Sequence, residues 1–291
     1  MTTTTVAIAV HNEEKIIKKV ITLWQKEPID EILIISSGST DNTNKIIHRL
    51  AKKDKRIRLI TEPKKTGKPN AINKLLTLAK HTIIIMTDGD VYIEPGAAKH
   101  LTRHLNKADK KIGIVAGHPI PLNPKGIFGL WMQMSCDILH EKRAKNIELD
   151  VTGNLYAIKK GIIKKIPENT TLDDAYVAHE TKKAGYKIIY EPEAKVRVKG
   201  VKNLHDFITQ KTRTRVGWHQ LRRAENITTS RTPTGELTYI RQTLKYLPTP
   251  TGIIAVPLYY AANAAAWLLA WWKYKTEKNY LKLWKPAKST K

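Results

Sequence analysis

Short apolar runs alternate with longer amphipathic segments over the first two-thirds of the chain. The apolar runs are rich in isoleucine and valine and have the length of buried strands, so they predict β-strands. They are Val6–Val10, Glu31–Ile35, Ile57–Ile60, His81–Thr87 and Ile112–Ala116. The segments between them predict helices at Glu13–Gln25, Asp41–Lys52, Pro69–Lys80 and Pro95–Lys107. This order predicts an α/β fold with a mainly parallel sheet and helices on both faces.

Polar residues directly follow three of these predicted strands. His11–Glu13 follows the first strand, Ser36–Asp41 the second and Asp88–Asp90 the fourth. Because parallel sheets bind ligands at the carboxyl ends of their strands, we expect the ligand site there. No GxGxxG or GxxxxGK[ST] sequence follows the first strand, which argues against a dinucleotide site or a P-loop.

The last third of the sequence has a different composition. Thr228–Glu236 is polar and contains proline and glycine, as in a linker. No charged residue occurs from Tyr246 to Trp272, and Gly252–Trp272 is mostly apolar. About 20 such residues are enough to cross a bilayer as a helix. Tryptophans and lysines gather at the end of this segment, as is typical of a membrane interface.

Two other interpretations of the apolar segment stay open. It could be an alanine-rich core helix, and Pro257 and Asn263 could make it kinked or re-entrant. A single span would also place one of two basic regions on the unfavourable side of the membrane. Gly126–His140 is a second apolar stretch, either at the headgroup boundary or in the core. We expect four parts: a main domain with interfacial helices, a linker, a transmembrane or re-entrant segment, and a basic tail, at 1–226, 227–250, 251–273 and 274–291.

The charge is strongly unbalanced. The chain has 291 residues, with 51 Lys and Arg against 26 Asp and Glu, a net charge of +25. This excess indicates an anionic partner, such as nucleic acid, acidic lipid or a phosphorylated substrate. No nucleic-acid-binding motif is evident, so we expect no nucleic acid. The single cysteine, Cys136, excludes an internal disulfide and a cysteine zinc site, and the N-terminus lacks the pattern of a signal peptide, which predicts a cytoplasmic location for most of the chain.

Asp88 and Asp90 are the first candidates for chemistry. Two carboxylates separated by one glycine at a strand end can hold a hard divalent cation through oxygen. Such an ion would neutralise a diphosphate and let it depart as a leaving group. A solvated turn is the alternative, but the position at a strand end favours the metal.

Asp173 and Asp174 are the second candidates. They follow Thr171 and begin a predicted helix that runs through Ala184. Acids are favourable at a helix start, with Thr171 as N-cap. One of them could also serve as a general base for an acceptor hydroxyl, because adjacent acids push one pKa upward. The two roles are compatible.

Two basic segments could bind phosphate. Gly67–Asn70 opens a helix, where backbone N–H groups and Lys68 could meet a phosphate. Arg213 and Arg215 lie on a predicted basic helix, about Asn203–Arg223, and could pair with diphosphate oxygens. Alternatively, the helix could rest its basic face on anionic lipid.

Taken in order, these segments resemble glycosyltransferase family 2, the inverting enzymes with a GT-A, Rossmann-like nucleotide-sugar-binding fold. The resemblance runs from about Thr5 to Arg223, and the apolar tail looks like the membrane-bound, cellulose-synthase-like branch in a short form. Its pieces are Val10–Glu13, Ser36–Thr43, Gly67–Lys68 with Asn73, Asp88–Asp90, Gly153–Ile158, Leu172–Asp174 with Ala184–Tyr186 and Glu191–Ala194, and Gln210 with Arg213.

The resemblance implies a role for each matching position. Asp174 would be the catalytic base, with Asp173 beside it. Asp90 would bind Mg²⁺ or Mn²⁺ together with Asp88. Gly153, Asn154 and Trp218 would lie near the acceptor. The nucleotide sugar would be bound by His11, Asn12, Glu13, Ser37, Asp41, Lys68, Asp88, Gln210 and Arg213.

Two positions depart from the family pattern. Ser36 and Ser37 stand where many relatives carry two aspartates, one of which can contact uracil. A guanosine donor such as GDP-mannose therefore becomes reasonable. Thr214 stands where a tryptophan is usual after the arginine, and Trp218, one helical turn further on, could replace it as an acceptor platform.

The sequence thus predicts a membrane-associated inverting hexosyltransferase, with its catalytic domain on the cytoplasmic side of the cell membrane. It would move a hexose from a GDP- or UDP-sugar, with mannose from GDP-mannose as one candidate, to a glycan linked to polyprenyl phosphate or diphosphate. Anionic lipids would be its other partners. A UDP-sugar-dependent polysaccharide or glycolipid synthase is an alternative. A nucleotidyltransferase and a non-catalytic protein that binds membranes or polyanions with the same fold are two more.

Overall fold

The computed structural model describes the chain except residues 1–2, 106–110, 147–149, 226–231, 233–238 and 277–291. The chain divides into two compact units. The first consists of Met1–Pro119, Leu149–Glu168 and Asp173–Val198, and the second of Ile120–Glu148, Asn169–Leu172 and Lys199–Lys291. Both predicted interfacial helices and the predicted membrane segment belong to the second unit.

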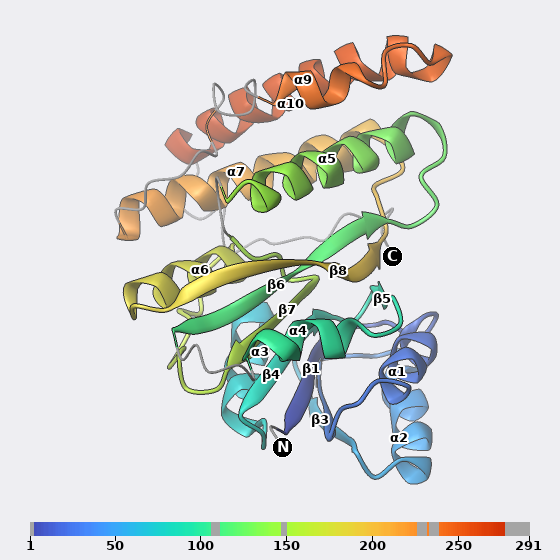
Figure 1. Ribbon diagram of the computed structural model, residues 1–291, viewed down its shortest axis with the longest axis vertical. Helices are drawn as coiled ribbons and strands as arrows, with labels where there is room; N and C mark the ends of the chain where they lie inside the picture. Colours follow the sequence, from blue (N-terminus) through green and yellow to red (C-terminus); the bar gives the residue numbers. More distant parts are fainter. Residues whose placement is uncertain (1–2, 106–110, 147–149, 226–231, 233–238, 277–291) are drawn as a thin grey trace. The chain divides into compact units, whose positions relative to one another are not determined.

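The first unit is built on an eight-stranded sheet with the order β3-β2-β1-β4-β7-β6-β8-β5 (Figure 1). β1, β2, β3 and β4 are parallel to one another, whereas β7 is antiparallel to both β4 and β6. The strands are β1 (Thr4–Val10), β2 (Glu31–Ser37), β3 (Ile57–Glu62), β4 (Ile83–Asp88), β5 (Tyr92–Ile93), β6 (Ile112–Pro121), β7 (Leu155–Lys159) and β8 (Lys187–Val198).

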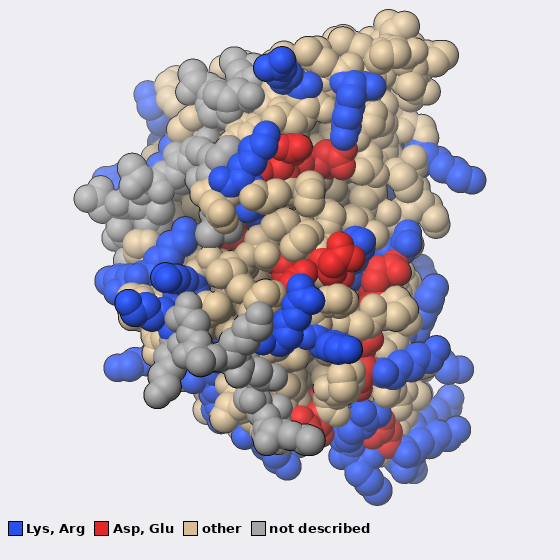
Figure 2. Space-filling view, in the orientation of Figure 1, with Lys and Arg blue, Asp and Glu red and all other residues tan. Residues whose placement is uncertain are grey.

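Helices cover both faces of this sheet, as the sequence predicts. Val6, Ala7 and Ile8 are consecutive in β1 and all fully buried, and neighbouring side chains of a strand point to opposite faces. The helices of this unit are α1 (Ile17–Gln25), α2 (Thr43–Lys53), α3 (Lys68–Leu78), α4 (Ala97–Leu105) and α6 (Asp173–Lys183). Lysines and arginines gather on the outer surface over α1 and α2 (Figure 2).

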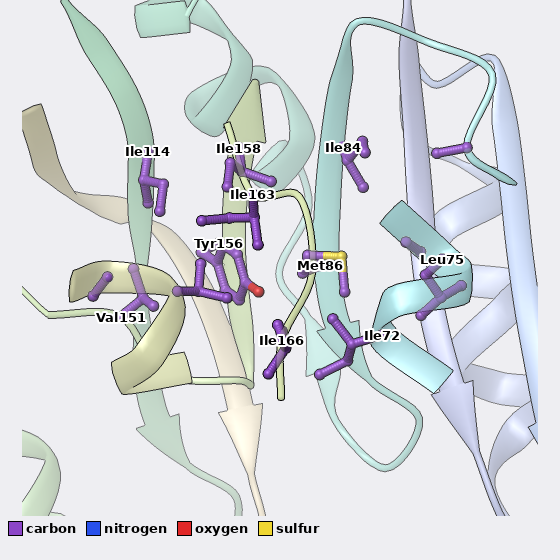
Figure 3. Close-up of a cluster of buried hydrophobic side chains, with 14 of the residues drawn as sticks. Ile72, Leu75, Ile84, Met86, Ile114, Val151, Tyr156, Ile158, Ile163 and Ile166 are labelled. Atoms are coloured by element: carbon purple, nitrogen blue, oxygen red, sulfur yellow. The ribbon is translucent and has the colours of Figure 1, made fainter. Parts of the chain in front are cut away.

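One large apolar cluster lies beneath the candidate site. It joins residues of the sheet to α3 and α6, including Ile72 and Leu75 of α3 and Val177 of α6. Figure 3 shows Met86 of β4 between Tyr156 of β7 and Leu75 of α3. The strand that ends in Asp88 and the helix that begins with Lys68 are therefore held together by a packed interior.

The predicted strands and helices of the first unit are all present, with ends that differ by a few residues. The sequence analysis did not predict β5, β7 and β8. β8 carries Lys187, Glu193 and Arg197 on exposed positions, and the apolar runs that mark the buried strands are missing from it. Strands of this kind resemble loops when the sequence is scanned for apolar runs.

The second unit is helical in the part of the chain that the structure describes. It contains α5 (Gly126–Ala144), α7 (Leu204–Glu225), α9 (Ile240–Leu244) and α10 (Pro250–Thr276). α10 continues through Pro257. α9 lies within the predicted linker, most of whose other residues are outside the described ranges, as are residues 277–291 of the predicted tail.

An aromatic cluster joins α5, α7 and α10, which run alongside one another in Figure 1. The Trp131 ring centroid lies 4.6 Å from that of Phe207 and 6.0 Å from that of Tyr259. The Trp131 indole N–H donates to the Ala255 carbonyl at 2.8 Å, so the buried polar end of the ring has a partner. The three helices therefore share one core.

α10 is the single helix among the described residues that is long and apolar enough to cross a membrane. Length and composition do not decide between a membrane span and the core helix of a soluble protein. The contacts of α10 are considered below.

Candidate active site

The loops after β1 and β2 are bonded to each other, as expected for parallel neighbours. Nδ1 of His11 lies 2.8 Å from the Ser37 carbonyl oxygen, and the Thr40 N–H donates to Oδ1 of Asn12 at 2.8 Å. Asn12 has φ of 56°, a left-handed conformation that asparagine tolerates. The polar residues that the sequence places after two strands therefore form one connected edge.

Asp41 holds the start of α2 at this edge of the sheet through hydrogen bonds. Its carboxylate accepts hydrogen bonds from the N–H groups of Glu14 at 3.1 Å and Thr43 at 3.0 Å. Burial alone would raise the pKa of Asp41, but these bonds outweigh it and lower the pKa. The Glu13 N–H donates to the Thr43 hydroxyl at 2.8 Å. Asp41 and Glu13 thus help to build the loop, and their contact with a nucleotide stays a prediction.

Ser37 is buried at the end of β2. Its hydroxyl accepts a hydrogen bond from the Thr66 N–H at 3.0 Å, which ties the strand to the loop before α3. Gly38 follows with φ of 64°, and a Cβ there would lie 2.5 Å from the Lys65 backbone nitrogen. This tight crossing brings the segment that carries Lys68 beside the ends of β1 and β2.

Lys68 lies at the start of α3 and is surrounded by carboxylates. Its Nζ is 2.8 Å from Oδ1 of Asp88 and 3.6 Å from Oδ2 of Asp173. Burial disfavours the charged amine, but Asp173, Asp88 and Asp174 together raise the pKa of Lys68 well above its usual value. Lys68 therefore carries a positive charge and joins β4 to the start of α6.

Asp174 is a carboxylate whose pKa is raised by its environment. Burial and the charge of Asp173 raise its pKa to about 6, although Lys68 and two backbone N–H groups act in the opposite direction. Those N–H groups belong to Ala175, at 2.8 Å, and Gly153, at 3.1 Å. A carboxylate with a pKa near neutrality can accept a proton from a substrate and release it again.

Gly153 and Asn154 lie between these carboxylates. A Cβ at Gly153 would lie 2.8 Å from Nζ of Lys68 and 3.5 Å from Oδ2 of Asp88. Nδ2 of Asn154 donates to Oδ2 of Asp88 at 3.3 Å. A larger residue at this position would therefore displace the end of Lys68, and Asn154 orients the other oxygen of Asp88.

Together these side chains form a pocket at the carboxyl end of β4. Its polar wall contains Lys68, Asp88, Asp173 and the backbone of Gly153, and apolar side chains such as Met86 form the rest. The structure thus brings together Lys68, Asp88 and Asp173, although more than 100 residues separate Lys68 from Asp173 in the sequence. A hydrogen bond from the Gly153 N–H joins Asp174 to this group.

Asp88 and Asp90 suit a divalent cation whose other ligands come from substrate phosphates and water. A Cβ at Gly89 would lie 2.6 Å from Cγ1 of Val10, so glycine is required in the turn that presents both carboxylates. The described residues hold no group of three or more His, Cys, Asp or Glu side chains that could bind a metal. Mg²⁺ commonly binds through one or two carboxylates together with substrate phosphates and water, and this donor set matches that pattern.

The remaining predicted site residues lie on α7 in the second unit. Gln210 and Arg213 are half-buried, and Trp218 is buried. Their roles at the diphosphate and the acceptor therefore stay predictions. The burial of Trp218 leaves little of its ring exposed as an acceptor platform.

The sequence analysis did not single out Tyr156, which also lines the pocket. It is buried in β7, and burial together with Asp173 and Asp174 raises the pKa of its hydroxyl. A prediction of β7 could have drawn attention to it, because Tyr156 is the second residue of the strand that follows Gly153 and Asn154.

Residues 5–166 match the family model described as Glycosyl transferase family 2. A poly-β-1,6-N-acetyl-D-glucosamine synthase of Staphylococcus aureus is 25% identical over 227 residues, which are 75% of this chain and 55% of that protein. The chain thus spans about half the length of that synthase. An uncharacterised protein of Methanocaldococcus jannaschii is 32% identical over 195 residues, 63% of this chain and 84% of its own length.

Solved structures show the same fold. A mannosyltransferase from Pyrobaculum calidifontis, solved with GDP-Man and Mn²⁺, has a TM-score of 0.68 and 17% identity, over 95% of this chain and 88% of that one. Glucosyl-3-phosphoglycerate synthase from Mycobacterium tuberculosis, solved with Mn²⁺, UDP-glucose and phosphoglyceric acid, has a TM-score of 0.54 and 17% identity, over 79% and 81% of the two chains. The α/β fold predicted from the sequence is therefore confirmed as a GT-A fold.

Proposed function

The chain is a member of glycosyltransferase family 2, and on that premise we propose that it transfers a hexose from a nucleotide sugar to an acceptor hydroxyl with inversion. The observation that carries this proposal is the environment of Asp174, whose pKa is raised to about 6 beside a pocket that ends in Asp88. Inversion needs one base on the acceptor side and stabilisation of the leaving group on the other.

Asp174 takes the proton of the acceptor hydroxyl. The Gly153 and Ala175 N–H groups hold its two oxygens, so the carboxylate has a fixed direction. Asp173 keeps the pKa of Asp174 high by repulsion, which makes Asp174 a stronger base once it is ionised. A base placed in this way typically accelerates transfer by about 10²- to 10⁴-fold.

Asp90 and Asp88 hold the cation, which is Mg²⁺ or Mn²⁺ in this proposal and which, when bound, offsets the charge of the departing diphosphate. Lys68 supplies a fixed positive charge next to Asp88. Because Lys68 already pairs with Asp88 and Asp173, it keeps these two carboxylates of the pocket together before any donor arrives. His11, Asn12 and Ser37 belong to the connected edge that takes the nucleotide.

The proposed donor is GDP-mannose. Two observations support it: Ser37 replaces an acid that could contact uracil, and the Pyrobaculum mannosyltransferase, which has a similar fold, was solved with GDP-Man. The similarity to a poly-β-1,6-N-acetyl-D-glucosamine synthase favours a second candidate, a UDP-sugar-dependent synthase. The base and the metal residues would be the same in both.

The proposed acceptor is a glycan linked to polyprenyl phosphate or diphosphate, reached at the cytoplasmic side of the cell membrane. A sugar hydroxyl needs a base, whereas a lipid monophosphate is already an anionic nucleophile, so Asp174 favours the sugar hydroxyl. The net charge of +25 suits anionic lipids and a phosphorylated acceptor.

Release of nucleoside diphosphate from a panel of GDP- and UDP-sugars, with Mn²⁺ or Mg²⁺ and a lipid extract, tests the proposal. We expect release from GDP-mannose, dependent on extract and metal. Release from a UDP-sugar alone would select the synthase. Release of pyrophosphate in a parallel assay, with a nucleoside triphosphate and a sugar phosphate in place of the nucleotide sugar, would identify a nucleotidyltransferase.

The Asp90→Ala variant separates an enzyme from a binding protein that keeps only the fold. Loss of metal-dependent release in this variant, with unchanged thermal unfolding, supports the proposed role of Asp90. A panel without any release, together with metal and donor binding that Asp90→Ala leaves unchanged, would establish the non-catalytic alternative.

A further inference from the structure

The exposed face of α10 is apolar along its length. Its exposed large side chains recur at helical spacing and are Ile253, Ile254, Leu258, Leu268, Leu269, Trp271 and Trp272. No charged residue interrupts this face before Lys273. A helix on the surface of a soluble protein presents polar residues to water, so this face is the reverse of the normal arrangement. We call these seven residues the α10 apolar face.

The opposite face of α10 is buried against protein and consists largely of small residues: Gly252, Ala255, Val256, Tyr259, Ala262, Asn263, Ala266 and Ala270. Within it, the Arg215 guanidinium of α7 donates to Oδ1 of Asn263 at 2.7 Å. Arg215 also lies 4.8 Å from the centre of the Trp267 ring. The hydrogen-bonded pair of Arg215 and Asn263 is thus buried between α7 and α10.

α7 follows α10 for most of its length. The Phe207 ring lies 5.8 Å from that of Tyr259 near one end, and the His219 ring lies 5.1 Å from that of Tyr274 near the other. From Tyr259 to Tyr274 the helix axis rises by roughly 22 Å at 1.5 Å per residue. The hydrocarbon core of a bilayer is about 30 Å thick.

This packing conflicts with a membrane span. If α10 crossed the bilayer, the packed part of α7 would have to enter with it and would bring Lys211, Arg213 and Arg215 into the hydrocarbon. Charged side chains there are rare and unfavourable. Leaving α7 behind would instead expose the small-residue face and separate Arg215 from Asn263.

Basic residues at both ends of α10 also favour a flat arrangement over a span. Arg241 and Lys245 precede the helix, and Lys273 and Lys275 end it. In a span, one of these pairs would lie on the side of the membrane where lysine and arginine are unfavourable. If the helix lies flat, both pairs reach the same layer of headgroups.

We propose that α10 lies in the plane of an anionic lipid surface, with the α10 apolar face in the headgroup–acyl boundary and α7 behind it. This inference deepens the membrane association in the proposed function. Its test measures lipid binding and not sugar transfer, so the inference and the proposed function can be contradicted independently of each other.

Vesicle sedimentation of the full chain is the first test. The vesicles contain phosphatidylcholine alone or equal amounts of phosphatidylcholine and phosphatidylglycerol. We expect binding that is tighter on the anionic vesicles and falls with added salt, because lysine and arginine reach the headgroups. The double variant Leu258→Glu, Leu268→Glu should bind at least about tenfold more weakly.

Leu78→Glu is the matched control. Leu78 of α3 is also an exposed leucine, at 38% of its surface against 48% for Leu258 and 71% for Leu268, but it lies outside the α10 apolar face. It should bind like the unmodified protein. Circular dichroism and thermal unfolding should be unchanged in both variants, because these side chains already face solvent. Equal vesicle binding by the folded double variant and the control would overturn the proposal.

Spin-label depths distinguish a flat helix from a span. Cys136 is the single cysteine of the chain and is buried, with its pKa raised to about 12, so the unmodified protein should take no label. Cysteines at Ile254, Ala261 and Leu268 occupy one face at intervals of seven residues. Similar shallow depths for all three labels support the flat arrangement. Depths that differ by about 20 Å from Ile254 to Leu268 would show a span and overturn it.

Sedimentation velocity without lipid tests a second copy as the occupant. A monomer that binds vesicles supports the proposal. A dimer that the Leu258→Glu, Leu268→Glu variant dissociates, and that vesicles do not compete with, would overturn it, because the apolar face would then be a protein interface.

Discussion

The two units of this protein bury and expose opposite kinds of side chain. Of the eleven large apolar side chains that are exposed among the described residues, only Leu78 belongs to the first unit. Seven carboxylates are buried in the described ranges, and six of them belong to the first unit: Glu27, Glu31, Glu62, Asp150, Asp173 and Glu191. The buried lysine and arginine side chains of the same ranges, Lys142, Arg143 and Arg215, belong to the second.

This difference fits the proposed lipid contact of the second unit. The first unit has isoleucine and valine inside and lysine outside, and its buried carboxylates have partners: Glu31 pairs with Arg58, Glu62 with Lys74, and Asp173 lies near Lys68 in the pocket. In the second, an aromatic cluster and the buried pair of Arg215 and Asn263 hold the helices together, and apolar groups of α10 also face outward. Water alone would not favour that arrangement, whereas a lipid surface would.

The largest effect is expected on the transfer rate, when the proposed catalytic base of the first unit is replaced. Asp174→Asn should lower the transfer rate by about 10²- to 10⁴-fold, because the amide cannot accept the hydroxyl proton. Single-turnover transfer from the donor identified by the panel is the measurement, with donor affinity as the control. A variant with near-normal transfer would contradict the base role and favour a lipid phosphate as acceptor.

A matched pair of leucine truncations sharpens the comparison of the units. Leu75→Ala, in the core of the first unit, should lower the free energy of unfolding by about 2–5 kcal/mol, because it leaves a cavity. Leu268→Ala, on the α10 apolar face, should change it by less than about 0.5 kcal/mol in the absence of lipid. Denaturant unfolding measures both, and a large loss for Leu268→Ala would mean that the face is packed in solution.

The buried polar pair of the second unit should matter more than a surface contact. Asn263→Ala removes the amide oxygen that accepts a hydrogen bond from the Arg215 guanidinium at 2.7 Å and should destabilise the protein by about 1–3 kcal/mol. Thermal unfolding with and without vesicles is the measurement. Asn263→Gln, which keeps the amide, should recover part of the loss. An unchanged melting temperature would show that α7 and α10 do not depend on this pair.

The pH dependence tests the electrostatics of Asp174. Its pKa is raised from 3.8 to about 6, so the base is protonated below about pH 6, and kcat/KM should fall towards tenfold per pH unit there. Because the folded state holds this proton more tightly than the unfolded state, the group lowers stability as pH rises from 3.8 to about 6. Asp174→Asn should therefore be more stable than the unmodified protein at pH 8, by ~1–3 kcal/mol. A flat rate profile between pH 5 and 7 would contradict the shift.

The smallest effects are expected from exposed ion pairs, in both units alike. Glu141→Gln removes the pair with Lys145 one turn further along α5, and Glu180→Gln removes the pair with Lys183 on α6. Each should change the free energy of unfolding by less than about 0.5 kcal/mol, because water screens exposed charges. Paired denaturation curves measure this, and a loss above 1 kcal/mol in either unit would reveal an unrecognised coupling.

The parts of the fold that the sequence predicted have strong local patterns. β1 to β4 and the helices between them follow from apolar runs and helical periodicity, and the rule for parallel sheets then locates the site at the strand ends. β8 was missed because a partly exposed strand lacks that pattern, whereas β7 has an apolar run of four residues that the scan passed over. Tyr156 was missed with β7, since its place in the pocket depends on the strand that carries it.

The sequence by itself determined the family, the GT-A fold and the identity of the candidate carboxylates, because these depend on residues and their order. Only the tertiary structure placed Lys68 among Asp88, Asp173 and Asp174, because burial and distance, which set the pKa values, arise from residues far apart in the chain. The same holds for α10. Its composition is equally that of a span, a core helix or a surface helix, and only its packing against α7 shows which face is buried and which is exposed.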